Sequence, residues 1–247
     1  MLFWKLNISR IYFLISSSSV SSSLTLTSNS SKLPFPAAVI FDWDSTLVDN
    51  WRAIHLSLNA TLTEMGHQTW TEEETRKRAK SSARDAFPNL FGKKSEQALK
   101  FFYEAFERFQ LETLKVMNGA EELIKALSKN GIYLAIVSNK NGDHLRKEVI
   151  ELGWSGYFQK VVGASDAIED KPSIEPVKMA LKSAGLGSNS IIWFVGDSVL
   201  DLQCATISGC VPILLEGSGI DDECLKDWPP HSIFSSCERL KEAFLDI

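Results

Sequence analysis

The stretch Ala37-Ala38-Val39-Ile40-Phe41-Asp42-Trp43-Asp44-Ser45-Thr46-Leu47-Val48-Asp49 decides how this chain folds. It begins with an apolar run that predicts a buried strand of a parallel sheet, and the polar residues after the run end that strand. In an extended backbone, residues two apart point to the same side, so Asp42 and Asp44 are expected to face one site. Two close carboxylates repel each other unless a cation or proton lies between them, and their oxygens suit a hard divalent ion such as Mg²⁺. A strand followed by a capped turn is the alternative interpretation of the same residues.

The bulk composition is that of a folded protein with an ordinary core. The chain has 247 residues, 44% of them hydrophobic and 23% charged, which suffices for one large domain or one domain with an insertion. Its net charge of −5 gives little basic potential, so nucleic acid is not an expected partner. The cysteines lack the Cys-x-x-Cys spacing of a zinc site, and we interpret them as reduced thiols of a cytoplasmic protein. They are Cys204, Cys210, Cys224 and Cys237.

A segment of different chemistry precedes the fold. Residues 1–36 are rich in serine and threonine and contain no acidic residue, and their apolar patch at residues 11–15 is too short to span a bilayer. A signal peptide, an organelle transit peptide and a disordered extension all stay open. We favour a disordered, non-catalytic tail, keep a cleaved targeting segment as the alternative, and leave residues 1–36 out of the predicted fold.

Residues 50–117 carry helical patterns. Residues 50–65 predict a first helix, and Thr71 with Glu74 three residues later forms a capping-box signature that opens a second. Residues 81–88 interrupt the pattern and are predicted to be a loop or irregular turn. A third helix is predicted after it, because apolar residues spaced three and four apart indicate a buried helix face. These residues are Leu99, Phe102, Phe106 and Phe109.

From residue 118 onward, strand and helix patterns alternate. Apolar runs near residues 132–137, 161–162, 191–195 and 211–215 are separated by helical segments, and Ser235 with Glu238 resembles a further capping box. Such alternation predicts an α/β fold, a Rossmann-like core of three layers with helices on both faces of a parallel sheet. Residues 37–49 and 118–247 are therefore assigned to this core, and residues 50–117 to an all-helical insertion after the first strand.

Polar residues follow several of the predicted strands. Ser138-Asn139-Lys140 follows the second strand, Lys171-Pro172 stands just before a helix predicted over residues 175–184, and Gly196-Asp197 follows another strand with Asp201 four residues on. Ligands bind at the carboxyl ends of the strands of such sheets, so these residues are expected to share one site. Each piece also has an ordinary interpretation: a strand-to-helix turn, a solvated lysine, or a helix N-cap that leaves Asp201 unexplained.

Together these pieces resemble the motifs of the haloacid dehalogenase superfamily of phosphotransferases, and the resemblance spans nearly all of residues 37–247. The first motif, Asp-x-Asp-x-Thr, is present as residues 42–46, with Ser45 where glycine is commonest in the family. The second is a serine after an apolar strand, the third a lysine, and the fourth Gly-Asp-x-x-x-Asp at residues 196–201. The resemblance implies a hydrolase of phosphoric monoesters that uses Mg²⁺ and an aspartyl-phosphate intermediate.

The resemblance also assigns a role to each motif residue. Asp42 is implied as the nucleophile and Asp44 as the acid and base for the leaving group and water. Ser138, Asn139 and Lys171 are implied to bind phosphate. The metal is implied to be held by the carboxylates of Asp42 and Asp197 and by the backbone carbonyl of Asp44, with Asp201 supporting the metal's water shell. A haloalkanoate dehalogenase is disfavoured, because those enzymes lack the acid at the position of Asp44.

The helical insertion resembles the C1 type of cap in this family, and its residues 82–87 resemble the specificity loop of phosphoglycolate-phosphatase-like members. Arg84 of this segment is expected to meet a carboxylate or a second anionic group of the substrate, or else to pair with Asp85 or solvent. The expected partner is a small phosphorylated metabolite, with phosphoglycolate favoured, for a monomer or homodimer without membrane insertion. A phosphosugar mutase and a non-catalytic binding protein on the same fold are the alternatives.

Overall fold

The structure, a computed structural model, describes residues 32–79, 81–216, 220 and 222–247. Most of the predicted tail, including its apolar patch, therefore lies outside the described residues. Within the described part, Leu33 is buried, and the carbonyl oxygen of Pro34 accepts a hydrogen bond of 2.9 Å from Nε1 of Trp193. The last residues before the first strand thus pack against the sheet domain.

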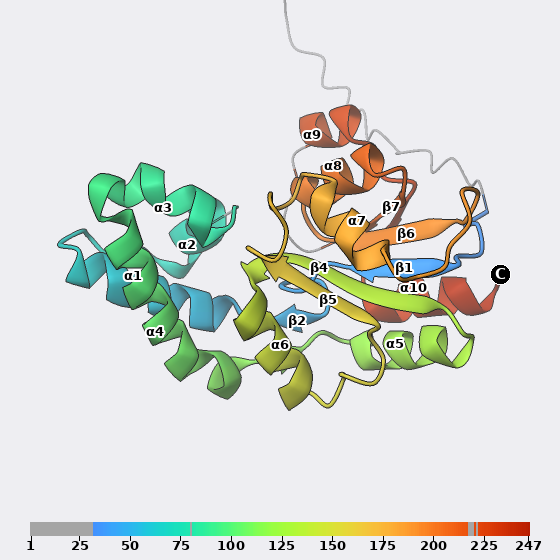
Figure 1. Ribbon diagram of the computed structural model, residues 1–247, viewed down its shortest axis with the longest axis horizontal. Helices are drawn as coiled ribbons and strands as arrows, with labels where there is room; N and C mark the ends of the chain where they lie inside the picture. Colours follow the sequence, from blue (N-terminus) through green and yellow to red (C-terminus); the bar gives the residue numbers. More distant parts are fainter. Residues whose placement is uncertain (1–31, 80, 217–219, 221) are drawn as a thin grey trace, which may run out of the picture. The chain divides into compact units, whose positions relative to one another are not determined.

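The core of the fold is a parallel sheet with the strand order β5-β4-β1-β6-β7-β8 (Figure 1). Its central strand is β1, which pairs in parallel with β4 on one side and β6 on the other. Every residue of β1 is buried, as the apolar run at its start predicts. The strands are β1 (Ala38–Phe41), β4 (Tyr133–Asn141), β5 (Lys160–Ala164), β6 (Ile192–Gly196), β7 (Val211–Leu215) and β8 (Ser232–Phe234).

Helices cover both faces of the sheet and complete the three layers (Figure 1). On one face, α5 (Ala120–Lys129), α6 (Gly142–Glu151) and α10 (Cys237–Leu245) pack with Val39 and Phe41 of β1. On the other, α7 (Glu175–Leu181) and α8 (Val199–Ile207) pack around Ile40. A short helix, α9 (Asp222–Asp227), follows β7. Side chains of β1 alternate between the two apolar clusters, which is the period of an extended strand, and the predicted α/β fold is confirmed.

The inserted helices form a cap between β1 and β4. Two short strands, β2 (Val48–Asp49) and β3 (Lys115–Val116), pair antiparallel, so both connections to the cap run side by side. The cap helices are α1 (Trp51–Glu64), α2 (Glu72–Arg78), α3 (Ala83–Phe91) and α4 (Ser95–Thr113), with the 3₁₀ turn Gly92–Lys94 before α4. The helical cap is thus confirmed as part of the fold, whereas the predicted domain boundaries at residues 37–49, 50–117 and 118–247 stay a prediction.

Local signals in the cap are confirmed in two places. The side chain of Thr71 accepts a hydrogen bond from the backbone of Glu74, and the Glu74 side chain accepts one from the backbone of Thr71, so the predicted capping box is formed. Phe102 and Phe106 of the predicted aromatic face are buried in the apolar cluster of the cap. That face therefore contributes to the packing of α1, α3 and α4.

The loop predicted over residues 81–88 is wrong, because α3 begins at Ala83 and includes Pro88. A proline in a helix interior costs about 3 kcal/mol or more. Two phenylalanines one turn apart, Phe87 and Phe91, are buried against the cap, and the ring of Phe87 lies 5.4 Å from that of Phe102. Burying a large apolar side chain contributes roughly 1.5–3 kcal/mol, so the pair offsets the proline.

Two smaller expectations also need correction. The helix α10 begins one residue later than predicted, since Ser236 and not Ser235 caps it and accepts a hydrogen bond of 3.3 Å from the backbone of Arg239. The strand β4 continues to Asn141, so Ser138-Asn139-Lys140 belongs to the strand and not to a turn. Cys204, Cys210, Cys224 and Cys237 are free thiols in the structure.

Candidate active site

Strand ends from the middle of the sheet build a single site. Asp42 follows β1, Ser138 lies in the last part of β4, and Asp197 follows β6, three strands that are neighbours in the sheet. The sheet is parallel, so the carboxyl ends of these strands lie along one edge. Lys171 reaches the same place from the segment between β5 and α7. The structure thus brings the four predicted motifs together.

Lys171 is the centre of the site. Its Nζ lies 2.5 Å from Oδ1 of Asp42 and 2.7 Å from Oδ1 of Asp201, and all three side chains are buried. The backbone of Lys171 is held by Asn139, whose amide nitrogen donates to the Lys171 carbonyl at 3.1 Å and whose amide oxygen accepts from the Lys171 N–H at 2.9 Å. Asn139, expected to bind phosphate, here fixes the lysine that faces the acids.

Three carboxylates surround this lysine. Oxygens of Asp42, Asp197 and Asp201 all lie within 4.8 Å of one another. The hydroxyl of Thr46 lies 3.5 Å from Oδ2 of Asp42 and 3.4 Å from Oδ1 of Asp197. Asp201 also accepts hydrogen bonds of 3.0 Å and 2.6 Å from the backbone and hydroxyl of Ser198, which caps α8. Both acids of the fourth motif therefore lie at the site: Asp197 directly after β6, and Asp201 in the first turn of α8.

Close approach explains the glycine in that motif. A Cβ atom on Gly196 would lie 2.3 Å from Cγ of Asp201. Such a distance is far below van der Waals contact, so any larger residue would push the acid away from Lys171. The spacing Gly-Asp-x-x-x-Asp is thus required by packing as well as by charge.

Burial perturbs the ionisation of these groups. Desolvation raises the pKa of Asp42 to about 6, although the charge of Lys171 opposes the rise. Desolvation, followed by the charges of Asp42 and Asp201, raises the pKa of Asp197 well above its usual range. Burial by itself would lower the pKa of Lys171, but Asp201 and Asp42 raise it, so the lysine stays charged. The cluster is an acidic site that one ammonium does not neutralise.

A divalent cation fits this donor set. If all three carboxylates are ionised, they and one ammonium carry a net charge of −2, which a divalent cation would balance, and carboxylate oxygens are hard ligands of the kind that Mg²⁺ takes. Asp201, expected only to support the metal's water shell, has a carboxylate oxygen within 4.8 Å of oxygens of both Asp42 and Asp197. The carboxylate of Asp44 pairs elsewhere, which is compatible with the expectation that its backbone carbonyl, not its side chain, faces the ion.

Asp44 belongs to a second ionic group that the sequence analysis missed. Its Oδ1 lies 2.8 Å from Nζ of Lys140, and the same ammonium lies 2.8 Å and 3.0 Å from the two carboxylate oxygens of Glu148. Lys140 lies two residues after Ser138, in the part of β4 where the pairing with β5 becomes irregular, so strand alternation does not predict where its side chain points. Nothing in the local pattern marks Glu148, which lies on α6.

A pocket of about 660 Å³ opens between this edge of the sheet and the cap. Its floor includes Asp42, Asp44 and Lys171, and the cap contributes two arginines, Arg76 and Arg78, together with several aromatic residues. These aromatic residues are Trp51, Trp70, Phe87, Phe102, Tyr103 and Phe106. A largely apolar wall around a polar floor is typical of a small-molecule site.

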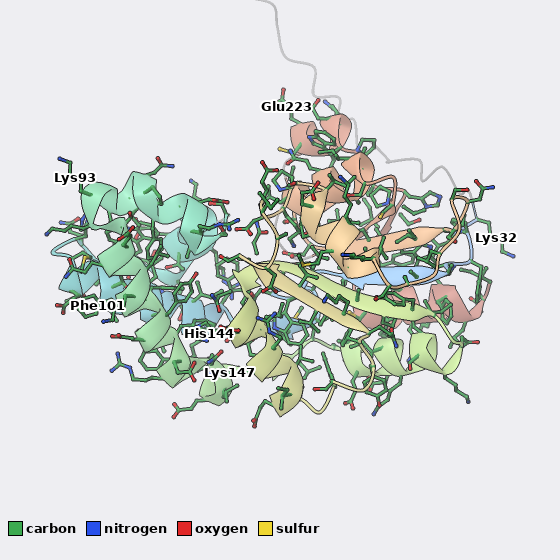
Figure 2. The ribbon with its side chains drawn as sticks, in the orientation of Figure 1. Lys32, Lys93, Phe101, His144, Lys147 and Glu223 are labelled. Atoms are coloured by element: carbon green, nitrogen blue, oxygen red, sulfur yellow. The ribbon has the colours of Figure 1, made fainter. Side chains whose placement is uncertain are left out.

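Cap and core also meet through ion pairs. Nη2 of Arg84 lies 2.7 Å from Oδ1 of the buried Asp170, and both residues line a neighbouring cavity together with Lys171. On α6, His144 and Lys147, labelled in Figure 2, lie 3.2 Å and 2.5 Å from the carboxylate of Glu107 on α4. Arg84 thus contacts a core acid next to Lys171, and its expected role in substrate specificity stays a prediction.

A parallel sheet with buried acids and a lysine at its carboxyl edge, covered by an inserted helical cap, defines a capped α/β protein with an acidic site at the edge of its sheet. This chain belongs to the family of haloacid dehalogenase-like hydrolases, whose family model matches residues 39–214. The predicted superfamily is therefore confirmed. No helix in the described part of the chain has the length and apolar character needed to cross a membrane.

Curated relatives agree with this assignment. Phosphoglycolate phosphatase of Aquifex aeolicus is 30% identical over 176 residues, covering 69% of this chain and 80% of the relative. Phosphoglycolate phosphatase of Pseudomonas savastanoi pv. phaseolicola is 25% identical over 222 residues, covering 86% of this chain and 81% of the relative. The family and these relatives identify the chain as a hydrolase of phosphoric monoesters, as predicted.

Solved structures share the fold. A haloacid dehalogenase-superfamily hydrolase from Ehrlichia chaffeensis is 29% identical with a TM-score of 0.58, covering 87% of this chain and 98% of that one. CbbY from Rhodobacter sphaeroides, solved in complex with phosphate, is 19% identical with a TM-score of 0.75, covering 86% of this chain and 100% of that one. The core and its cap are thus an arrangement that known structures contain.

Proposed function

We propose that this protein is a Mg²⁺-dependent phosphatase that hydrolyses a small phosphomonoester, phosphoglycolate or a close analogue, through an aspartyl-phosphate on Asp42. The observation that carries the proposal is the position of Lys171, whose ammonium lies between Asp42 and Asp201 on the floor of the pocket. Such an arrangement places a nucleophilic carboxylate beside a cation able to receive phosphate oxygens. The names of the curated relatives support phosphoglycolate as the first substrate to test.

In the first step, a carboxylate oxygen of Asp42 attacks phosphorus and the bond from phosphorus to the ester oxygen breaks. Asp44 donates its proton to the departing alkoxide, which leaves as an alcohol. In the second step, Asp44 accepts a proton from water while the water oxygen attacks the phosphorus of the aspartyl-phosphate. Inorganic phosphate then leaves, Asp42 regains its carboxylate, and Asp44 is protonated again for the next cycle.

Other residues bind and orient the transferred group. Ser138 is buried in β4 and lines the pocket, which supports the proposal that its hydroxyl donates to a phosphate oxygen. Lys171, with its backbone held by Asn139, supplies positive charge to the same group. Mg²⁺ held by Asp42, Asp197 and the Asp44 carbonyl, with Asp201 alongside, would reduce the repulsion between an anionic nucleophile and an anionic phosphate.

Removal of divalent metal tests the cofactor part of the proposal. Treatment with EDTA is expected to lower phosphate release from phosphoglycolate by roughly 100-fold or more, because the acids at the site would repel the substrate, and excess Mg²⁺ should restore it. Asp197→Asn is expected to raise the Mg²⁺ concentration for half-maximal activity by about 10-fold or more. Full activity in EDTA would contradict a metal requirement.

The substrate part is tested by Arg84→Ala in a screen of metabolite phosphates. If Arg84 binds a second anionic group of the substrate, kcat/KM for phosphoglycolate should fall by about 10-fold, because one charge-assisted hydrogen bond is lost. Phosphate esters whose alcohol part is uncharged, such as glycerol phosphate, should change little. Arg239→Ala, an exposed arginine of α10 that pairs with Glu242 and lies outside the pocket, serves as the matched control. Equal losses on all substrates would contradict the specificity role and leave Arg84 as a tie between cap and Asp170.

A further inference from the structure

A buried ionic chain runs from α6 to the proposed acid and base. Glu148 on α6 is fully buried, the Lys140 side chain is 5% exposed, and the Asp44 side chain is 19% exposed. An ammonium has three donors, and those of Lys140 reach Oδ1 of Asp44 at 2.8 Å and the two oxygens of Glu148 at 2.8 Å and 3.0 Å. Asp44 and Glu148 therefore accept all three hydrogen bonds that the Lys140 ammonium can donate.

Glu148, the residue of this ionic group farthest from the pocket, is hydrogen-bonded to the segment that carries Asp42 and Asp44. Glu148 accepts a hydrogen bond of 2.6 Å from Nε1 of Trp43 and another of 2.6 Å from the amide of Asn50. Trp43 lies between the two site acids in sequence, and Asn50 leads into the first cap helix. The ammonium of Lys140 also lies 5.1 Å from the ring centre of Phe106 on cap helix α4. These contacts fix Glu148 and leave Lys140 little freedom to turn.

Stability alone is a weak explanation for this arrangement. Burying a lysine and a glutamate removes both charges from water, and apolar residues of similar volume often stabilise a core equally well. Lys140 is also not needed to neutralise the Asp42 cluster, because Lys171 already contacts two of its acids. The third donor of Lys140 instead meets Asp44, the acid with access to the pocket.

We infer that Lys140, held in place by Glu148, is the positioning residue for Asp44. By engaging Oδ1 of Asp44, Lys140 sets the direction of the other carboxylate oxygen, the one that exchanges a proton with the leaving group and then with water. The inference rests on the proposed function, because it concerns how Asp44 performs the proton transfers of that reaction. It assigns Lys140 no contact with substrate.

A comparison of leaving groups tests the inference. An alkoxide needs a proton as it departs, whereas p-nitrophenolate leaves without one, so misplacing the acid should slow alkyl esters selectively. For Lys140→Met we expect kcat/KM for phosphoglycolate to fall by about 10- to 100-fold, and that for p-nitrophenyl phosphate by less than about 3-fold. Glu148→Gln should give the same selectivity with a smaller loss, and Lys140→Arg should recover part of the alkyl activity. Lys125→Met, on an exposed lysine of α5, is the matched control and should change neither substrate.

The design separates a positioning role from simpler ones. The ratio of the two kcat/KM values is taken within one preparation, so a variant that folds incompletely lowers both values and leaves the ratio unchanged. The use of kcat/KM also excludes the later hydrolysis of the aspartyl-phosphate, which follows departure of the leaving group. Equal loss on both substrates in Lys140→Met, from direct binding of phosphate by Lys140 or from general damage to the fold, would overturn the inference.

Failure of the inference is distinguishable from failure of the proposed function. Asp44→Asn should show the selective loss more strongly than Lys140→Met, since it removes the acid itself. If Asp44→Asn is selective and Lys140→Met is not, Asp44 keeps its role and Lys140 loses the one inferred for it. If Asp44→Asn slows both esters equally, the proton-transfer role proposed for Asp44 is wrong, and the inference fails with it.

Discussion

Asp42→Asn is expected to lower kcat for phosphate release by about 10⁴-fold or more, because the amide lacks the anionic oxygen that attacks phosphorus. The side chains have almost the same shape, so the contact with Lys171 can persist and the fold should be preserved. Release of phosphate from phosphoglycolate and from p-nitrophenyl phosphate is the measurement. Both substrates should fail alike, because both require attack by the same nucleophile.

The matched control for this variant is Asp143→Asn. Asp143 lies in the first turn of α6 with its side chain 84% exposed, and its replacement should leave kcat within about 2-fold. Mass spectrometry of acid-quenched wild-type enzyme should find phosphate on Asp42 during turnover. Persistent hydrolysis of p-nitrophenyl phosphate by Asp42→Asn would reject Asp42 as the nucleophile.

Lys171→Met is expected to lower the free energy of unfolding by about 3–5 kcal/mol at pH 7 in EDTA, because it leaves buried carboxylates without their ammonium partner. The side chains of Lys171, Asp42 and Asp201 are 4%, 9% and 2% exposed, so water cannot replace the lost charge. Urea unfolding of wild type and variant is the measurement. Added Mg²⁺ should reduce the difference if the acids bind it.

The pH dependence of this stability follows from Asp42. Its pKa is raised to about 6 in the fold from a usual value of 3.8, so between pH 4 and 6 the folded state binds more protons than the unfolded chain. The loss of folding stability caused by ionised Asp42 is thus at its full value above pH 6 and becomes smaller as the pH falls toward 4. Because Lys171 lowers the pKa of Asp42, this carboxyl should take up its proton at a higher pH in Lys171→Met, and the stability deficit should shrink as the pH falls, since protonation removes the repulsion.

The control for Lys171→Met is Lys178→Met, which removes an exposed lysine of α7 whose side chain is 59% accessible and pairs with Glu175. A surface ion pair contributes about 0–1 kcal/mol, so the control should lose at most that amount. A Lys171→Met protein as stable as the control, in EDTA at pH 7, would contradict the view that this lysine balances buried charge.

Sequence reasoning succeeded where the apolar residues of a segment recur with the regular spacing of a strand or of a helix. The apolar run before Asp42 and the alternation after residue 118 predicted the parallel sheet, because strands and helices differ in the spacing of their buried residues. Strand direction then predicted that Asp42, Ser138 and Asp197 would meet at one edge, since all strands of such a sheet end on the same side.

It failed where packing between distant segments outweighs local preference. Proline and paired serines predicted a loop over residues 81–88, but burial of Phe87 and Phe91 against α4 made this segment a helix. Arg84 illustrates the same limit, since its bond to Asp170 depends on where the cap lies over the core. Neither contact has a signature in the residues near it.

The sequence by itself determined the class of fold, the cap and the acids of the site, because each depends on periodicity or on a motif contained within a few residues. Only the tertiary structure decided the partners of the charged groups. Lys140 meets Asp44 because β4 continues past Ser138, and Glu148 meets Lys140 because α6 packs beside Trp43. The contacts of Lys140 with Asp44 and of Glu148 with Trp43 bring residues far apart in sequence to within 3 Å, and no local pattern encodes that distance.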